Sequence, residues 1–167
     1  MTSFCLTTNG TEQAHELGSA IGEVLRGGDL VDLRGDLGAG KTTTTVGIAK
    51  SLGVTSTVRS PTFTFIHHHR CTTQVQELLH VDLYRVDHAA ELEGLGLFDL
   101  FDDDTVVVVE WMERAGGQLP APNLTVELVA TGETARAVVV QIGDDRAEAF
   151  LQALGRRGLQ ADVSGPA

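Results

Sequence analysis

The feature that most restricts the fold of this chain is a glycine-rich segment from Gly35 to Thr42. It reads Gly-Asp-Leu-Gly-Ala-Gly-Lys-Thr: a glycine, four residues and then Gly-Lys-Thr, which is the Walker A spacing of a phosphate-binding loop. The glycines allow backbone angles that other residues avoid, so successive N–H groups can turn toward an anion. A helix starting near Lys41 would add the positive end of its dipole. The segment, preceded by strand-like residues 30–34, therefore predicts a strand, a phosphate loop and a helix in direct succession.

Charge composition limits what else the chain can bind. Twelve Lys and Arg residues stand against 23 Asp and Glu residues, and the formal net charge is −11. A field of that sign repels phosphate backbones, so we expect no autonomous nucleic-acid binding. An anionic ligand must instead be held by a local cluster of donors. The chain has only two lysines, Lys41 and Lys50, and the first lies in such a cluster.

Length and hydropathy indicate one globular domain. The chain has 167 residues, 42% of them hydrophobic, which is enough for a sizeable core without disulfides. No apolar run approaches the roughly 18 residues that a transmembrane helix needs. Met1 to Cys5 lack the features of a signal peptide, and Cys5 and Cys71 cannot form a disulfide framework. We expect a cytoplasmic protein with no membrane association.

Strand-like and helix-like segments alternate along most of the chain. We predict a three-layer α/β P-loop NTPase-like domain over residues 1–155, with a mixed, mostly parallel central sheet and antiparallel hairpins. Residues 156–167 are expected to be a disordered C-terminal tail. The predicted strands are 4–8, 30–34, 63–66, 77–86, 106–109, 124–130 and 135–142, and the predicted helices are 11–26, 41–52, 87–95 and 146–154.

A magnesium site is expected next to the phosphate loop. The Thr42 hydroxyl is placed to ligate Mg²⁺, and a carboxylate usually completes such a site from the end of a buried strand. The apolar run 106–109 followed by Glu110 has that form. The competing interpretation is a buried strand that simply ends in an exposed acid; the phosphate loop favours the metal role.

Two further segments have chemistry that periodicity alone does not settle. Asp82 would share one strand face with His80 and Tyr84, where it could orient water or form a structural pair with an Arg or a His. Ser60-Pro61-Thr62 is either a γ-phosphate-sensing loop or an ordinary turn into a strand. These alternatives remain open at the level of the residues.

Two conspicuous features are not expected to be sites. In the run His67-His68-His69, neighbouring strand residues face opposite sides, so all three cannot ligate one ion. Cys71 lacks a CxxC partner and is expected to be inert.

Five ordered motifs together resemble the TsaE (YjeE) family, the P-loop ATPase subunit of bacterial tRNA threonylcarbamoyladenosine biosynthesis. The resemblance covers roughly residues 11–122. Its motifs are Gly35-Asp36-Leu37-Gly38-Ala39-Gly40-Lys41-Thr42-Thr43, Ser60-Pro61-Thr62-Phe63, His80-Val81-Asp82-Leu83-Tyr84-Arg85, Glu91-Leu92 with Leu95-Gly96, and Glu110-Trp111.

The resemblance assigns roles to individual residues. It implies that ATP is bound with Mg²⁺, that Thr42 and Glu110 hold the metal, and that Asp82, Lys41 and Thr62 take part in hydrolysis. The implied nucleotide-binding residues are Glu12, near the base, and Leu37, Gly38, Ala39, Gly40, Lys41 and Thr42 of the loop.

The implied activity is slow, Mg²⁺-dependent ATP hydrolysis that is activated by, and coupled to, a TsaD/TsaB-type protein assembly. That assembly would transfer the threonylcarbamoyl group to tRNA. Two alternatives are a P-loop small-molecule kinase, although the ten arginines form no lid-like segment, and a non-hydrolysing, nucleotide-dependent binding module.

Overall fold

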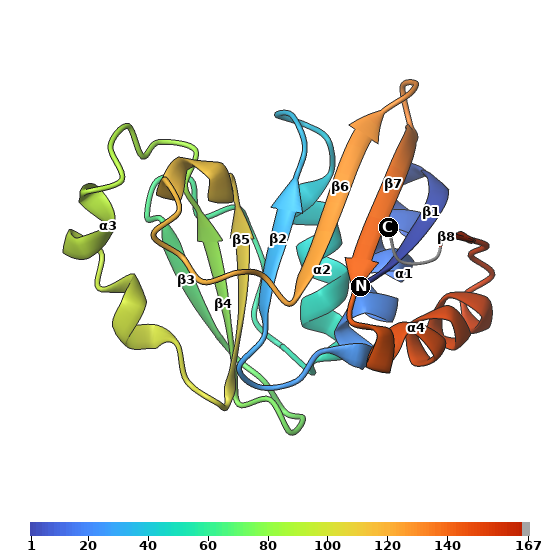
Figure 1. The fold of residues 1–167 in the computed structure, drawn as a ribbon, viewed down its shortest axis with the longest axis horizontal. Coiled ribbons are helices and arrows are strands. Elements are labelled where there is room, and N and C mark those ends of the chain that lie inside the picture. The colour runs from blue at the N-terminus through green and yellow to red at the C-terminus, as the bar shows by residue number, and fades with distance from the viewer. Residues whose placement is uncertain (165–167) are drawn as a thin grey trace.

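The computed structural model describes residues 1–164. Its elements alternate along the chain much as the hydrophobic pattern predicts (Figure 1). The strands are β1 (Thr2–Asn9), β2 (Leu30–Arg34), β3 (Ile66–Arg70), β4 (Glu77–Asp82), β5 (Thr105–Glu110), β6 (Leu124–Ala130), β7 (Ala135–Ile142) and β8 (Asp162–Ser164). The helices are α1 (Gly10–Val24), α2 (Lys41–Ser51), α3 (Glu91–Gly94) and α4 (Asp144–Arg156), with 3₁₀ segments η1 (Leu97–Leu100) and η2 (Met112–Ala115).

The strands form one mixed sheet in the order β3-β4-β5-β2-β6-β7-β1-β8. Strands β4, β5, β2 and β6 run parallel in its centre. The outer strands join by antiparallel pairing, β3 to β4 on one side and β7, β1 and β8 beyond β6 on the other. The mixed sheet is confirmed, but within residues 1–164 only three of its seven strand pairings are parallel; these form the centre, where the strand that precedes the glycine loop lies.

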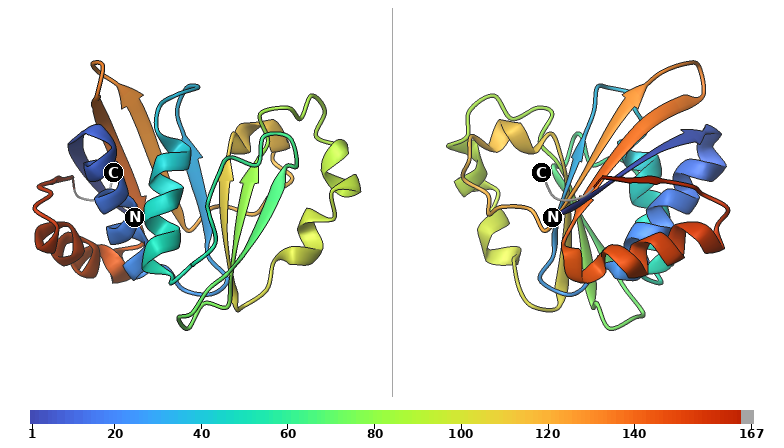
Figure 2. Two further views of the ribbon diagram at one scale, coloured as in Figure 1. Left: turned by 180° about the vertical axis from the view of Figure 1, so that it is seen from behind. Right: turned by 45° about the vertical axis from the view of Figure 1, so that its right-hand side comes forward.

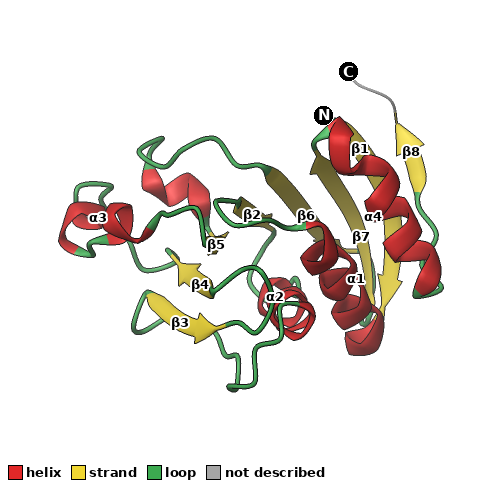
Figure 3. Cartoon of the chain, turned by 90° about the horizontal axis from the view of Figure 1, so that it is seen from below, coloured by secondary structure: helices red, strands yellow, loops and turns green. Residues whose placement is uncertain are grey.

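Two hydrophobic cores lie on opposite faces of this sheet. One gathers α1, α2 and α4, with Phe4 of β1 packing edge-on against Phe150 of α4. The other lies under α3, η1 and η2 and includes Leu30, Val107 and Val109 of the central strands. Figures 2 and 3 show the long helices on one side and the short segments on the other. The three layers are therefore a helical layer, the sheet and a thinner layer of short helices and loops.

Helix α2 is held close to α1 by a pair of glycines. A Cβ atom built on Gly18 would lie 2.1 Å from the carbonyl oxygen of Thr44, and one on Gly47 would lie 2.1 Å from that of His15. The Ser19 hydroxyl also donates to the Gly47 carbonyl, at 3.2 Å. Since α2 is rich in threonines, which favour helices weakly, this contact with α1 supplies stability that local propensity does not.

Two predicted strand boundaries differ from the structure because a turn occupies residues that were expected to be part of the strand. Over residues 63–66 composition predicts a strand, but the Pro61 carbonyl accepts the N–H groups of Thr64 and Phe65 and closes a turn, so β3 begins at Ile66. The strand predicted over 77–86 ends at Asp82, whose Oδ1 accepts the N–H of Tyr84 at 2.9 Å. An Asp side chain that bonds the backbone two residues ahead forms an Asx turn.

The expectation of a disordered tail from residue 156 is wrong for residues 156–164. Arg157 forms ion pairs with Glu16 and Glu23 of α1, and Leu159 is buried in the core. The chain then pairs antiparallel with β1 as β8. These anchors lie far apart in the sequence, so composition alone does not reveal them; residues 165–167 lie outside the described part.

No helix within residues 1–164 has the length and apolar character needed to cross a membrane.

Candidate functional site

Most of the predicted site residues meet where the parallel strands end. The loop after β2, the end of β4 and the end of β5 all lie at the same edge of the sheet, the upper edge in Figure 1. They surround a cavity of about 370 Å³. Its lining comprises Leu37, Gly38, Gly40, Lys41, Thr42, Thr43, Ser60, Thr62, Asp82, Tyr84, Glu110 and Trp111. Ligands of open α/β sheets bind at this edge.

Glycines give the P-loop its shape. Gly35, Gly38 and Gly40 have φ angles of 142°, 79° and 107°, values that side chains with a Cβ atom disfavour. A Cβ on Gly35 would also lie 2.5 Å from the Leu128 carbonyl oxygen of β6. The loop then leads directly into α2 at Lys41, so the helix N-terminus faces the cavity.

The Lys41 ammonium lies inside the loop. Its Nζ donates to the carbonyl oxygens of Gly35 at 2.6 Å and Asp36 at 3.0 Å, and it lies 4.3 Å from the centre of the Trp111 ring. Burial lowers the pKa of Lys41, and the nearby carboxylates of Glu110 and Asp82, among others, oppose that shift. The structure thus holds a largely buried cation where an anion would enter.

Thr42 and Glu110, the two residues predicted to ligate a metal, lie next to each other. The Thr42 hydroxyl donates to Glu110 Oε1 at 3.0 Å. The same carboxylate oxygen lies 2.8 Å from Nε2 of His80, which is completely buried on β4. The sequence predicts no role for His80, although its alternation with Asp82 places both on one strand face. His80 fixes the orientation of the Glu110 carboxylate.

The donor set is suited to Mg²⁺. Magnesium takes oxygen ligands at 2.0–2.1 Å in octahedral geometry, so two adjacent ligand atoms lie about 2.9 Å apart. The two oxygen atoms of Thr42 and Glu110 are 3.0 Å apart. No group of three His, Cys, Asp or Glu side chains is gathered as a metal site within residues 1–164. An ion here would therefore take its remaining ligands from water and a phosphate, as magnesium usually does.

Asp82 is engaged by the Ser60–Thr62 segment. Its Oδ2 accepts hydrogen bonds from the hydroxyls of Ser60 at 3.0 Å and Thr62 at 2.9 Å, and these hydroxyls lie 2.6 Å apart. Its Oδ1 accepts the N–H of Tyr84. These partners take the place of the Asp–Arg or Asp–His pair that the sequence left open. The carboxylate ties the Ser60–Thr62 segment to the end of β4, beside the cavity.

Two residues with backbone strain flank these groups. Phe65, after the Ser60–Thr62 segment, and Trp111, directly after Glu110, have φ angles of 63° and 62°. Positive φ is uncommon for residues other than glycine and is found often at functional sites. The surrounding packing therefore holds Trp111, which lines the cavity, and Phe65, whose carbonyl accepts the Asp82 N–H, in conformations that these residues do not prefer.

Arg136 on β7 is a P-loop contact that the sequence did not reveal. Its Nε donates to the Ala39 carbonyl at 3.0 Å and its Nη2 to that of Gly38 at 3.3 Å. Its other guanidinium nitrogen donates to carbonyls of the β6–β7 hairpin. Arginine in an antiparallel strand far from any motif has no local signature, so only the fold identifies it.

A smaller cavity of about 180 Å³ lies on the α1 side of the P-loop. Thr11 and Ala14 line it together with Gly38, Thr43 and Arg136. Glu12, expected near the nucleotide base, is exposed on α1 and is not among the residues lining this cavity or the one beside Lys41. Its place near a base stays a prediction.

Leu37 and the two features not expected to be sites are also placed by the structure. The Leu37 side chain is 75% exposed at the tip of the P-loop. His69 is buried and bonds Ser56, whereas His68 is exposed and bonds Glu77. The run therefore does not converge on one point. Burial raises the pKa of the Cys71 thiol to about 11, so it is unreactive near neutral pH.

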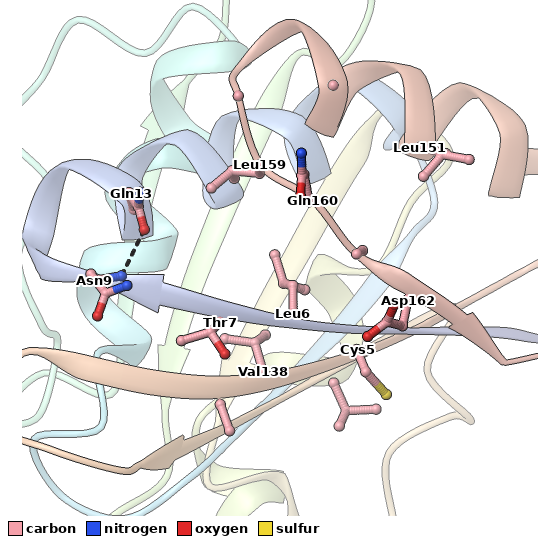
Figure 4. A pocket seen from close by; sticks show the side chains of 15 residues that line it. Cys5, Leu6, Thr7, Asn9, Gln13, Val138, Leu151, Leu159, Gln160 and Asp162 are labelled. Carbon is pink, nitrogen blue, oxygen red and sulfur yellow. Dashed lines mark hydrogen bonds between the residues drawn. The ribbon is translucent and has the colours of Figure 1, made fainter.

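A larger cavity of about 1040 Å³ lies away from this site, at the outer edge of the sheet. Figure 4 shows Leu6 and Thr7 of β1 on one side of it and Leu159 and Gln160 on the other. Its lining shares no residue with the P-loop. Although this cavity is larger than the one beside Lys41, it is not part of the phosphate-binding site.

The glycine loop between β2 and α2, at the carboxyl edge of a parallel sheet centre, defines a P-loop α/β protein. Comparison with known proteins identifies the family: residues 8–138 match the family model described as "Threonylcarbamoyl adenosine biosynthesis protein TsaE". The chain belongs to the TsaE family.

Similar proteins agree with this assignment. The tRNA threonylcarbamoyladenosine biosynthesis protein TsaE of Streptomyces coelicolor is 40% identical over 151 residues, which covers 89% of this chain and 96% of that protein. The protein of the same name from Bacillus subtilis is 40% identical over 77% of this chain and 79% of its own length. The crystal structure of Bacillus subtilis YdiB superposes with a TM-score of 0.74 at 30% identity, covering 95% of this chain and 98% of that one. The chain is thus a member of a family that acts in tRNA threonylcarbamoyladenosine biosynthesis.

Proposed function

We propose that this protein is an Mg²⁺-dependent ATPase that couples ATP hydrolysis to a TsaD/TsaB-type assembly in tRNA threonylcarbamoyladenosine formation. The observation that carries the proposal is the convergence of Lys41, the Thr42–Glu110 pair and the Asp82-anchored segment on one cavity. Lys41 would bind phosphate, and the Thr42–Glu110 pair would hold a metal ion. The Ser60–Thr62 segment, which Asp82 anchors, would respond to the γ-phosphate. A cytoplasmic location, where tRNA is modified, goes with this proposal.

The P-loop and Lys41 bind the triphosphate in this proposal. Lys41 Nζ now donates to two loop carbonyls, and it would exchange these for phosphate oxygens that bear full negative charge. The ammonium already makes charge-assisted bonds to the carbonyls, but a phosphate oxygen adds the attraction of a full negative charge, so the exchange is favourable. Arg136 holds the loop to β7 through the carbonyl oxygens of Gly38 and Ala39.

Thr42 and Glu110 would hold Mg²⁺, with His80 keeping the carboxylate in place. When bound, the ion supplies neutralisation of the charge that develops on the phosphates during transfer. The chain's own contribution is to keep the hydroxyl and the carboxylate at ligand spacing before ATP arrives. This preorganisation reduces the reorganisation needed in the reaction.

Asp82 in this proposal acts first through the Ser60–Thr62 segment. Both hydroxyls are bonded to its carboxylate, so a γ-phosphate entering the cavity competes with Asp82 for the same donors. Loss of that phosphate would return the segment to Asp82. Nucleotide switches usually work in this way: a loop is held by the γ-phosphate and released after hydrolysis. Release of the Ser60–Thr62 segment would reset a bound partner.

The test is steady-state ATP hydrolysis with and without the partner assembly. Wild-type protein should be slow alone and faster with the assembly, and phosphate release should require no small-molecule acceptor. A rate that the assembly does not change would contradict the coupling, and a phosphorylated metabolite would indicate a kinase.

A matched pair of variants separates hydrolysis from binding alone. Thr62→Ala removes one hydroxyl from Asp82, whereas Thr64→Ala removes an exposed hydroxyl from the same turn. We expect Thr62→Ala to bind ATP normally and to hydrolyse it at least about 10-fold more slowly. Thr64→Ala should behave as wild type. If Thr62→Ala hydrolyses ATP slowly and still supports tRNA modification fully, the protein is a binding module in which hydrolysis has no part.

A further inference from the structure

A second hollow lies behind the P-loop, on the face of the sheet that carries η2. We call this hollow, of about 580 Å³, the acidic recess. Trp111 borders both the recess and the cavity beside Lys41, so the two are neighbours. The polar side chains that line it are Asp32, Arg34, Asp36, Glu113 and Glu127.

Asp32 is the unusual member of this set. It lies on β2 and only 3% of its surface is exposed. Its Oδ2 accepts a hydrogen bond from Nε of Arg34 at 2.7 Å, but its Oδ1 is buried with no partner among residues 1–164. Buried polar atoms are nearly always paired, and leaving one unpaired destabilises the fold, more so if it is charged. Asp32 lines the recess, so a cationic donor bound there would lie next to a carboxylate whose Oδ1 has no partner within residues 1–164.

The electrostatics of the recess favour a cation. In its lining, four carboxylates face one guanidinium, that of Arg34, which is itself half exposed. Burial raises the pKa of Asp32, Arg34 opposes the shift, and the like charge of Glu113 adds to it. A positive group entering the recess would therefore offset, by charge attraction, both the cost of burying the Asp32 carboxylate and its repulsion by Glu113.

The shape of the recess argues against a simple metal ion. Across residues 1–164 no three acidic or histidine side chains are close enough to hold one ion, so these carboxylates are spread over the lining. Its volume is in the range of sites for organic groups. A guanidinium has five donors in one plane and stacks on flat or polarizable side chains, which Trp111 and Met112 provide here.

We propose that the acidic recess receives an arginine side chain of the partner assembly. The choice of occupant rests on the proposed function, which supplies a protein partner, and on the net charge of −11, which favours basic protein surfaces. The recess also touches the nucleotide site: Gly35 and Asp36 line it, and their carbonyl oxygens hold Lys41. An arginine seated there would contact the backbone that positions the P-loop cation.

This contact makes partner binding and nucleotide binding interdependent. If arginine in the recess alters the Gly35–Asp36 backbone, it changes how Lys41 binds phosphate, and by linkage ATP changes partner affinity by the same factor. The recess thereby offers a route for partner activation that does not require the partner to enter the phosphate cavity.

The first experiment measures binding of the ATP-loaded protein to the partner assembly. Asp32→Asn keeps the shape of the side chain and removes its charge, and Glu127→Gln does the same at the exposed wall of the recess. Glu148→Gln removes an equal charge from α4 and is the control. Asp32→Asn should weaken partner binding at least 10-fold and Glu127→Gln several-fold, with ATP affinity unchanged in each. If both recess variants bind the partner as tightly as Glu148→Gln does, the proposal is overturned.

The second experiment does not depend on the partner. Nα-acetyl-arginine amide is titrated into the isolated protein, and amide chemical shifts are followed by NMR, with the lysine analogue and Mg²⁺ in separate titrations. Shifts of Asp32 and Glu127 that saturate with the arginine probe and disappear in Asp32→Asn support the recess. No arginine response, or a stronger response to Mg²⁺ alone, overturns it. If wild type fails to bind the assembly while the probe still binds, the coupling in the proposed function fails and the guanidinium site stands.

Discussion

Asp82 and Glu110 lie opposite each other in the parallel register of β4 and β5, yet they hold different segments of the chain. Glu110 accepts from Thr42 at the start of α2, and Asp82 accepts from Ser60 and Thr62 of the following loop. Two adjacent carboxylates thus connect the P-loop helix and the loop after it to one edge of the sheet. Substitutions at this edge and around it should have distinct effects on metal binding, phosphate binding and stability.

Glu110→Gln should reduce the magnesium-dependent part of ATP affinity by at least about 10-fold. The amide oxygen can still accept from Thr42, but it is a much poorer ligand for a hard cation than a carboxylate. Calorimetric titrations of ATP with Mg²⁺ and with EDTA measure the difference. The exposed Glu93→Gln on α3 is the control. An equal loss in EDTA would show that Glu110 acts on the fold or the phosphates and not through a metal.

Lys41→Ala should weaken ATP binding by about 10- to 100-fold, corresponding to the roughly 1.5–3 kcal/mol of a hydrogen bond to a charged group. Lys50→Ala is a natural control, because it removes the other lysine of the chain from the exposed end of the same helix. Equilibrium binding of a fluorescent ATP analogue reports both. Similar ATP affinities for the two variants would show that Lys41 does not bind the phosphates.

Gly47→Ala should destabilise the fold by at least about 1–3 kcal/mol, because its Cβ would meet the His15 carbonyl oxygen at 2.1 Å. Backbone cannot give way cheaply, so α1 and α2 must separate. Among residues 1–164, a Cβ on Gly155 of α4 meets no atom within 4 Å, so Gly155→Ala should instead stabilise by about 0.5–1 kcal/mol. Urea unfolding followed by circular dichroism compares them, and a stable Gly47→Ala protein would mean that α1 and α2 can repack.

Asp32→Asn should be more stable than wild type at neutral pH, because burial raises the pKa of Asp32 and makes its charged form costly in the folded state. A carboxyl whose folded pKa is raised loses stability as pH rises through its titration. The advantage of Asp32→Asn should therefore shrink as pH falls and both side chains become neutral. Thermal unfolding from about pH 4 to about pH 8 measures it. A difference that is constant with pH would exclude the ionisation of Asp32 as its cause.

The motif-bearing parts of the site were predictable from local sequence. The order of strand, glycine loop and helix places Lys41 and Thr42, and the apolar strand before Glu110 places that acid at the edge of the sheet. Both depend on backbone rules that act over a few residues. The family motifs then pointed to Asp82 and Thr62, which the structure brings to the same cavity.

Other contacts had no local signal. The hydrogen bonds of His80 to Glu110 and of Arg136 to the P-loop join segments that are 30 or more residues apart. The ordering of residues 156–164 depends on ion pairs with α1 and on pairing with β1. From sequence alone, a polar residue on a strand or in a glycine-containing tail is predicted to be solvent-exposed, because its partners are distant in the chain.

By itself, the amino-acid sequence determined that this chain carries a phosphate loop between a strand and a helix, since glycine spacing and hydrophobic periodicity act locally. Only the tertiary structure decided which carboxylate faces which hydroxyl, which arginine holds the loop, and that within residues 1–164 Asp32 is buried with one oxygen unpaired. The physical reason is strand order: β5 and β6 flank β2 although both follow it far along the chain, and no short-range rule specifies that pairing.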